Sequence, residues 1–500
     1  MEEQNNSSRV SSGYRKSFFA TILFSGVQIF QIIIRIIKSK FVALIIGPAG
    51  MGISSLLYST AELISASTNL GLKTSGVKAV AAANREENKE IIAKTVFVLR
   101  RLILLTGLLG TIVCAILAPL WSKASFGNAN YVWSFVIVSL VILFEQLNSG
   151  ELVLLQGTQQ KRYLAKANII GQTISLLFTI PLYYFLGVKA IALVLVLSAL
   201  VTFVISRCFS NKLHMEVIRV TWKETFTIGR EMIKLGFFLS LQFLIGQLVV
   251  YVVRNYVSNT GGIEDVGLYS AGTTIVTTYI GLVFAAIATD YFPRLASTKT
   301  NEELQETVYT QADITLLLLA PIIVAFIIFI KPIVILLYSD KFLPIEEMMY
   351  WSVGATLLKA MGWAASNALL AKAKPSVFFL NEFISACYTM PLNLVGYSKW
   401  GLVGFGISTL LSYVIYLVQV LLFTKKLFGI SYPTVLWKSF LGLNIVVLAA
   451  VLVKYFCSEI AGYIIGCVLL LTITIYVFKQ LEVKMGLISS VIDRIKRNKL

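Results

Sequence analysis

Three polar residues share one face of the first long apolar stretch of the chain. Gln28, Gln31 and Arg35 are spaced by three and four residues within QIFQIIIRIIKSKFVALIIGPAGMGISSLLY, residues 28–58. A helix presents residues at this spacing on the same side. A cation at membrane depth is costly and normally faces a polar cavity. The pattern therefore predicts a site for an anionic group. Lys40 follows near the expected membrane interface. Its side chain could line a cavity or extend to the lipid headgroups, and the sequence favours neither role.

Further cations lie inside other apolar segments. Lys359 is about ten residues from either end of segment 349–371, where a charge costs about 2.5–3.5 kcal/mol and cannot easily reach headgroups; we therefore expect it to bind substrate. Arg254 follows Gln247 by the same seven-residue step that separates Arg35 from Gln28. Arg254 is closer to a segment end, so headgroup contact stays an alternative. Arg101 adjoins Arg100, and since adjacent helix positions point about 100° apart, one of the two can face a lumen while the other anchors the helix.

Acidic residues also occur within the apolar segments, and Glu62 and Glu145 are the deepest of them. Glu382 is a third candidate. Such carboxylates can pair with Arg35, Arg254 or Lys359. Alternatively they can titrate and couple transport to protons or sodium, because burial raises a carboxyl pKa. The sequence is consistent with both interpretations.

Composition identifies a polytopic membrane protein. The chain has 500 residues, of which 57% are hydrophobic and 14% charged, against about 25% charged in soluble proteins. Its mean hydropathy is +0.80. The net charge of +18 is explained by positive loops inside a membrane, so nucleic acid is not expected as a partner. The five scattered cysteines contain no CxxC pair, and we predict no metal site.

Motifs of enzymes are missing from the sequence. There is no Walker A, HExxH or GxSxG pattern, so we expect a transporter and no enzyme. No cofactor is expected either. The driving force would be a proton or sodium gradient, or the membrane potential, which is worth about 2.3 kcal/mol per charge per 100 mV.

The hydrophobic pattern predicts an all-α fold with about fourteen transmembrane helices, since each span needs about 20 apolar residues. The second and eighth are rich in Gly, Ser and Thr, which suits close packing or a cavity lining. The expected spans are residues 17–38, 41–70, 95–118, 131–153, 164–186, 189–208, 233–256, 264–290, 311–330, 349–371, 376–396, 401–424, 437–455 and 461–479.

The loops predict orientation and lobes. Most of the 43 Lys and Arg residues fall on one side if both termini are cytoplasmic. A weak repeat relates GMGISSLLYSTAELI to VGLYSAGTTIVTTYI, which begins at Val266. Internal repeats are typical of alternating-access transporters with a site between two lobes. The expected parts are an N-terminal six-helix lobe (1–208), a cytoplasmic linker (209–232), a pseudo-symmetric six-helix lobe (233–425), and two appended helices with a basic tail (426–500).

Several short motifs, in order along the chain, resemble those of the polysaccharide or O-antigen flippases of the multidrug/oligosaccharidyl-lipid/polysaccharide exporter superfamily. They are KFVALIIGPAGMGISSLL (40–57), FGNANY (126–131), FPRLAS (292–297), and SDKF, LLKA and LLAKAKPSVFF between 339 and 379. The resemblance implies a V-shaped transporter with a central basic cavity in the bacterial inner membrane. It implies flipping of undecaprenyl-pyrophosphate-linked oligosaccharide from the inner to the outer leaflet. Lys40 and Lys359 look like basic positions of the family pattern, whereas Arg35 and Arg254 rest on spacing alone.

Other functions remain as alternatives. A lipid II flippase needs nearly the same physics, and an ion-coupled drug or cation exporter of the same superfamily would need an acidic lumen. A membrane scaffold for the glycan polymerase would not need Arg35 or Lys359 within the bilayer. Besides the lipid-linked oligosaccharide and membrane lipids, the polysaccharide polymerase machinery is a candidate partner.

Overall fold

The computed structural model describes residues 2–86, 88–215, 218, 220–373 and 375–485. Side chains are described from residue 30 onward, apart from residues 235, 238, 239 and 485. Within the described ranges the regular structure is entirely helical, which confirms the predicted all-α class. The chain divides into two compact units, Met1–Gly267 and Leu268–Leu500, called unit 1 and unit 2 below.

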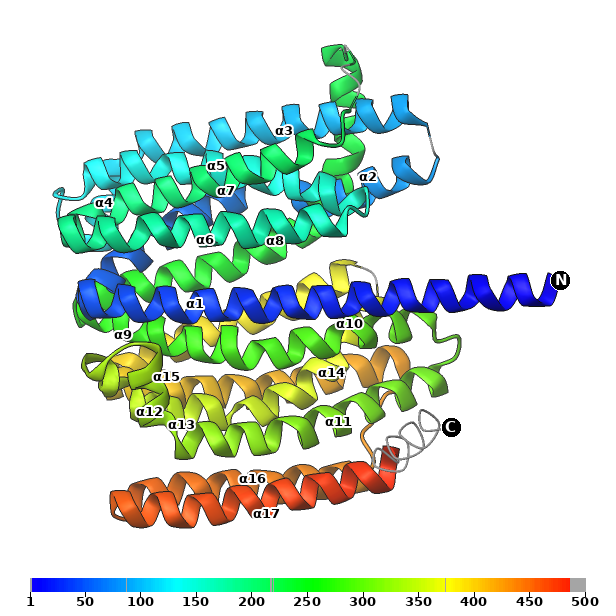
Figure 1. Cartoon of the computed structure of the whole chain (residues 1–500). Helices are drawn as coiled ribbons and strands as arrows, with labels where there is room; N and C mark the ends of the chain where they lie inside the picture. Colours follow the sequence, from blue (N-terminus) through cyan, green and yellow to red (C-terminus); the bar gives the residue numbers. More distant parts are fainter. Residues whose placement is uncertain (1, 87, 216–217, 219, 374, 486–500) are drawn as a thin grey trace. The chain divides into compact units, whose positions relative to one another are not determined.

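Unit 1 is a bundle of long helices (Figure 1). Its elements are α1 (Glu2–Thr68), α2 (Leu72–Arg85), α3 (Lys89–Ile116), α4 (Ala118–Phe126), α5 (Val132–Gly157), α6 (Lys161–Leu186), the 3₁₀ turn η1 (Gly187–Ala190), α7 (Ile191–Asn211) and α8 (Trp222–Thr260). Helix α5 lies at the centre, packing against α3, α7, α2 and α1. Its buried face includes Phe135, Val138 and Ile142, which belong to one apolar core shared by α1, α5 and α7.

Helix α1 contains a break at the motif GPAGMG. Gly47 has φ 64° and ψ −172°, a conformation that residues with a side chain rarely adopt, and the next residue, Pro48, has no amide hydrogen to donate. These two residues therefore interrupt the helix at this motif. The helix continues past residue 38, where the first span was expected to end, as far as the break. Lys38 consequently lies inside the helix, nine residues or about 13 Å before Gly47.

Helix α8 packs within unit 1, although the sequence repeat assigned it to the second lobe. It contacts α1, α2, α3 and α4. Gly236 of α8 meets Gly71, and a Cβ built on Gly236 would lie 2.8 Å from the Gly71 carbonyl oxygen. Two adjoining glycines therefore allow the backbones to approach more closely than larger residues would. The lobe boundaries taken from the repeat remain a prediction.

The start of α8 has a complete capping box. Thr221 accepts a hydrogen bond from the amide of Glu224 at 3.3 Å, and Glu224 accepts one from the amide of Thr221 at 2.8 Å. These bonds, first from the Thr221 backbone and then from its hydroxyl, hold the pKa of the Glu224 carboxyl below its usual value. The reciprocal bonds satisfy backbone donors that would otherwise be free at a helix start.

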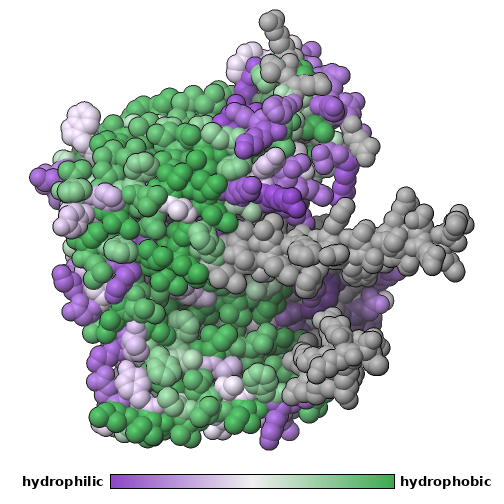
Figure 2. Space-filling model, in the orientation of Figure 1, coloured by the Kyte–Doolittle hydropathy of each residue, from purple (hydrophilic) through white to green (hydrophobic). Residues whose placement is uncertain are grey.

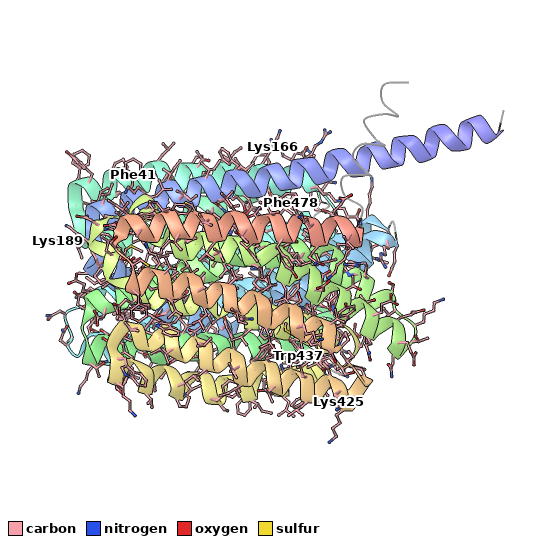
Figure 3. All side chains as sticks on the ribbon, turned by 90° about the horizontal axis from the view of Figure 1, so that it is seen from below. Phe41, Lys166, Lys189, Lys425, Trp437 and Phe478 are labelled. Carbon is pink, nitrogen blue, oxygen red and sulfur yellow. The ribbon has the colours of Figure 1, made fainter. Side chains whose placement is uncertain are left out.

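The surface of unit 1 separates into apolar and polar zones. Figure 2 shows hydrophobic residues over most of α3, α5, α6 and α7, and hydrophilic residues gathered at the end where α2 and the start of α3 lie. Figure 3 shows Lys189, in η1, at the far end of α6 from Lys166. An apolar girdle with polar ends is the surface that a bilayer requires.

Unit 2 is organised around α11. This helix is buried along most of its length and packs against α14, α16, α17 and α13. The elements are the π-helix η2 (Ile275–Ile280), α10 (Gly281–Ser297), α11 (Asn301–Ile328), α12 (Ile330–Leu337), the 3₁₀ turn η3 (Asp340–Ile345), α13 (Glu346–Gly354), α14 (Thr356–Lys372), α15 (Pro375–Phe428), α16 (Thr434–Phe456) and α17 (Glu459–Met485). Helix α9 (Ile263–Thr274) spans the boundary between the units in sequence.

The last two helices form a pair on α11. Helices α16 and α17 lie side by side in Figure 1 and both contact α11. Lys484 of α17 forms an ion pair with Asp313 of α11. Five residues, 429–433, connect the end of α15 to the start of α16. Figure 3 labels Lys425 and Trp437 on the two sides of this connection.

Nine segments of the described chain are helical, long and apolar enough to cross a membrane. The protein is therefore a multi-pass membrane protein. Two of these segments, Lys161–Asn211 and Pro375–Phe428, have 51 and 54 residues, more than twice the about 20 that one crossing needs. Each contains a glycine with φ 55°, Gly187 and Gly401, at the places where the hydrophobic pattern separated two spans. The total of fourteen spans stays a prediction.

Candidate functional site

A polar cavity lies inside unit 2, between α14 and α15. Its volume is ≈ 430 Å³, within the range of about 300–1,000 Å³ typical of ligand pockets. Rings, hydroxyls and amides make up most of its wall. The lining residues are Lys359, Trp363, Ser366, Asn367 and Leu370 of α14 and Phe378, Glu382, Ser385, Thr389, Asn393, Thr409, Ser412, Tyr413 and Tyr416 of α15. The cavity thus collects hydroxyl, amide and charged groups from two largely apolar helices.

Lys359 lines this cavity, as a functional lysine in that segment should. Its Nζ lies 5.3 Å from the ring centroid of Phe284 and 5.7 Å from that of Tyr413. Both distances are within the range of cation–π attraction, which stabilises the charge without a carboxylate. Within the described part of the chain, the ammonium group forms no ion pair. Its three hydrogens are therefore available to a guest molecule.

Glu382 is held in place by a chain of hydrogen bonds. Gln419 Nε2 donates to Asn381 Oδ1 at 2.9 Å, and Asn381 Nδ2 donates to Glu382 Oε1 at 3.0 Å. The Tyr416 hydroxyl also lies 3.0 Å from Glu382 Oε1 and 2.9 Å from Ser366 Oγ. The network fixes the orientation of the carboxyl group, which is the usual effect of a connected polar network in a low-dielectric interior.

A second, smaller cavity adjoins the first. It has a volume of ≈ 120 Å³ and shares Asn393, Thr409 and Tyr413 with the larger one. Val276 and Thr277 of the π-helix η2 line its other side. Single π-helical turns are rare and frequently occur at functional sites. The two cavities adjoin at these shared residues and are together called the groove of unit 2 below.

Unit 1 brings together the two deep carboxylates. The Tyr58 hydroxyl donates to Glu145 Oε1 at 3.0 Å, and Glu62 follows Tyr58 by one helical turn on α1. Arg254 of α8 is near enough to Glu62 to attract it electrostatically, and Arg254 Nη1 donates to the Ser55 carbonyl at 3.2 Å. Glu62 is thus attracted by Arg254, while Glu145 has a tyrosine as its hydrogen-bond donor. The roles of both carboxylates in charge pairing or ion coupling stay predictions.

The remaining predicted residues on α1 are spread along the helix. Arg35 is exposed, and Gln31 and Lys40 are half-buried. The side chain of Gln28 lies outside the described residues. The common helical face predicted for Gln31 and Arg35 therefore exists within one helix, and its role in binding stays a prediction.

Arg101 acts as an anchor for the start of α8. Its guanidinium donates to the Val220 carbonyl at 3.1 Å and to Thr225 Oγ1 at 2.8 Å. It also lies 4.6 Å from the ring centroid of Phe97 and 4.3 Å from that of Trp222. These contacts join α3 to α8, and they occupy the group that we predicted could face a lumen.

An ion-pair network that sequence reasoning did not select lies in unit 1. Glu151 of α5, whose side chain is 4% exposed, pairs with Arg100 of α3 and Arg207 of α7, each at 2.6 Å. Ser210 of α7 adds a hydrogen bond to the same carboxylate. Three helices thus meet at one buried charge. The signal was an acidic residue inside an apolar segment, but its partners are more than fifty residues away in sequence.

Comparison with known proteins decides the family. The sequence model of the family described as "Polysaccharide biosynthesis protein" matches residues 41–347, more than half of the chain. The chain belongs to that family. A search of curated proteins found no match.

Solved structures share the fold over most of the chain. The lipid II flippase MurJ in an inward closed conformation superposes with a TM-score of 0.72 at 15% identity, covering 93% of this chain and 99% of that one. An inward-facing multidrug resistance MATE transporter of the MOP superfamily superposes with a TM-score of 0.67 at 16% identity, covering 79% of this chain and 94% of that one. A MOP superfamily transporter from Pyrococcus furiosus, described as having a binding pocket of reverse polarity, superposes with a TM-score of 0.59 at 15% identity. The match covers 82% of this chain and 94% of that one.

These likenesses show that the chain shares its helical fold with these proteins, and the family model confirms the predicted recognition. The number of spans and the lobe boundaries stay predictions. The proteins named are a flippase and transporters. The prediction of a transport protein rather than an enzyme is confirmed at this level.

Proposed function

We propose that this protein is a flippase that moves undecaprenyl-pyrophosphate-linked oligosaccharide from the inner to the outer leaflet of the bacterial cytoplasmic membrane. Membership of the polysaccharide biosynthesis family supports a glycan substrate, and the flippase fold supports a lipid-linked one. The single observation that carries the proposal is the polar groove of unit 2, which holds Lys359 and Glu382 within apolar helices.

The physical task explains why such a groove is needed. A polar glycan and a pyrophosphate must cross about 30 Å of hydrocarbon while the polyprenyl chain stays in lipid. Side chains that donate and accept hydrogen bonds replace the lost hydration of the headgroup. Alternating access then exposes the groove first to the cytoplasm and later to the outside. Both termini would be cytoplasmic, because most basic residues then face inward.

The driving force follows from the charge of the substrate. An inside-negative potential of about 100 mV favours outward movement of each negative charge by about 2.3 kcal/mol. A pyrophosphate diester carries two such charges. We propose that the potential supplies the basic driving force, and that Glu62 and Glu145 in unit 1 add coupling to a proton or sodium gradient. O-antigen or a related surface polysaccharide is the proposed product of the pathway, with the polymerase machinery receiving the flipped unit.

The test is deletion of the gene in its host, followed by mass spectrometry of undecaprenyl-pyrophosphate-linked oligosaccharides and measurement of surface polysaccharide. Accumulated linked units together with lost surface glycan support the proposal. Unchanged pools with intact glycan contradict it.

A drug or cation exporter is the second candidate, because a multidrug resistance MATE transporter shares the fold and Glu382 lines the groove beside aromatic rings. Efflux of a fluorescent cation from cells with and without the gene separates the two functions. Faster loss of dye from cells with the gene would favour the exporter.

A further inference from the structure

We propose that the groove of unit 2 binds the sugar rings of the substrate, and that the pyrophosphate is held elsewhere. This inference rests on the proposed function and makes it more specific. It assigns the groove a ligand class, an uncharged oligosaccharide, from the chemistry of its walls.

The first argument is charge. Among the described residues that line the two cavities, Lys359 is the one cation and Glu382 the one carboxylate. A pyrophosphate diester carries two negative charges and is normally held by several cations or by bidentate arginines. A wall with a single lysine cannot balance those charges, and an ionised carboxylate beside them would repel them. The larger cavity is therefore poorly matched to the anionic part of the substrate.

The second argument is the kind of polar groups present. Hydroxyl and amide groups, which both donate and accept, predominate over charges along the groove. Sugar hydroxyls have the same dual capacity, so each can be satisfied by such a neighbour. The groove continues past Asn393 and Thr409 into the smaller cavity, where Thr273, Thr277 and Ser352 extend the same lining. Two adjoining cavities lined in this way suit several linked rings.

The third argument is the aromatic walls. Trp363, Tyr413 and Tyr416 line the larger cavity, and Tyr269 and Phe405 line the smaller one. Aromatic faces provide apolar contact area beside polar groups, and the C–H faces of sugar rings require this combination. Phosphate groups gain nothing from such faces.

The fourth argument is that two polar groups in the groove are ready to bind but unused. Both hydrogen bonds to Glu382 go to Oε1, so Oε2 has no hydrogen-bond partner in the described chain and can accept from a sugar hydroxyl. Ser412, 4% exposed, lines the larger cavity, and its Oγ has no partner among the described residues. A buried polar atom without a partner is rare in folded proteins. A ligand hydroxyl would satisfy it.

The experiment compares two lipids with the purified full chain in nanodiscs. The probes are undecaprenyl pyrophosphate and undecaprenyl-pyrophosphate-linked oligosaccharide extracted from the host strain that lacks this gene. The dissociation constant for each is measured by native mass spectrometry. We expect the wild type to bind the glycan-bearing lipid at least about tenfold more tightly than the bare lipid, because charge-assisted bonds in a buried site have this magnitude.

The variants Glu382→Gln and Tyr413→Leu should each lower the affinity for the glycan-bearing lipid about tenfold and leave that for the bare lipid unchanged within about twofold. Glu306→Gln and Trp400→Leu, at exposed positions of unit 2 outside both cavities, are the matched controls. Ser412→Ala removes only an unpartnered hydroxyl, so it should fold normally, and it should still weaken glycan binding by about threefold.

Three results are decisive against the inference. Equal loss of affinity for both lipids would place the pyrophosphate in the groove. Unchanged glycan affinity in all three variants would place the sugars elsewhere, while the proposed function would stand. If the wild type binds neither lipid, the proposed function fails together with the inference.

Discussion

The Tyr58 hydroxyl donates a hydrogen bond to Glu145 Oε1 over 3.0 Å, and this bond connects α1 to α5 inside unit 1. Glu62 lies one turn further along α1, close enough to interact electrostatically with the same tyrosine. Arg254 attracts Glu62 electrostatically and donates a hydrogen bond to the Ser55 carbonyl. Two carboxylates thus lie near one tyrosine hydroxyl.

We predict that Glu145→Gln abolishes any stimulation of transport by a proton gradient. The amide keeps the shape of the side chain and can still accept from Tyr58, but it cannot release a proton. Flipping is measured in proteoliposomes with and without an imposed pH difference. Glu264→Gln, a carboxylate at the start of α9, is the control. Equal stimulation in Glu145→Gln and wild type would show that Glu145 takes no part in coupling.

Lys359 is predicted to speed transport by contacting the substrate. Replacing it with Gln removes the charge that lies over Phe284 and Tyr413. Loss of one charge-assisted hydrogen bond, about 1.5–3 kcal/mol, should slow flipping at low substrate concentration about tenfold or more. The rate is measured in proteoliposomes beside Lys341→Gln, an exposed lysine of unit 2. A normal rate in Lys359→Gln would remove this residue from the binding site.

The ion-pair network around Glu151 is predicted to stabilise unit 1. Glu151→Ala leaves Arg100 and Arg207 without their carboxylate. We expect the free energy of unfolding to fall by about 2 kcal/mol. This loss is smaller than for a fully buried pair, because the Arg207 side chain is 41% exposed. Unfolding in detergent is followed by circular dichroism. Glu90→Gln breaks the exposed pair with Lys94 and should change stability little. Equal effects of the two changes would contradict the prediction.

The contact between Gly236 and Gly71 is predicted to tolerate no side chain. Gly236→Ala places a Cβ 2.8 Å from the Gly71 carbonyl oxygen, so α2 and α8 must separate, at about 1–3 kcal/mol. Gly246 lies on the same helix and has no atom within 4 Å of its Cβ position. Gly246→Ala should therefore be neutral or slightly stabilising. The thermal unfolding midpoints of Gly236→Ala and Gly246→Ala are compared. A similar midpoint in both variants would show that α8 can shift freely and would contradict the prediction.

The capping box at α8 predicts a pH dependence of stability. The pKa of Glu224 is lowered from its usual value of 4.5 by its bonds to Thr221. Because the pKa of Glu224 is lower in the folded than in the unfolded state, its ionised carboxylate stabilises the fold at pH values above the unfolded pKa of 4.5. This stabilisation is lost as the pH falls from 4.5 through the folded-state pKa. Glu224→Gln should thus be less stable than wild type at pH 7, and the difference should vanish toward pH 3.

Thermal midpoints across that range provide the measurement for the Glu224 prediction. Glu231→Gln, at an exposed position of the same helix, is the control variant. A difference between Glu224→Gln and wild type that persists unchanged at pH 3 would assign the effect to something other than ionisation of Glu224.

Local signals in the sequence were sufficient for the class of protein and for several individual positions. The long apolar runs determine an all-helical membrane protein, because only helices and closed barrels satisfy the backbone within lipid. Gly47 and Pro48 determine the break in α1, since their backbone preferences act locally. Lys359 could be selected because a lysine in the middle of an apolar segment needs a polar surrounding, and such a surrounding is present in unit 2.

Partners could not be read from the sequence, because they come from helices far apart along the chain. Glu151 meets Arg100 and Arg207 only after α3, α5 and α7 have packed together. From the sequence alone either Arg100 or Arg101 could face a lumen, and the fold places the first turn of α8 over Arg101. The sequence by itself determined which charges had to be buried or solvated, from the energy of placing a charge in hydrocarbon. Only the tertiary structure decided which side chain binds each of these charges. Hydrogen bonds and ion pairs depend on distances of a few ångströms between segments that the sequence does not place.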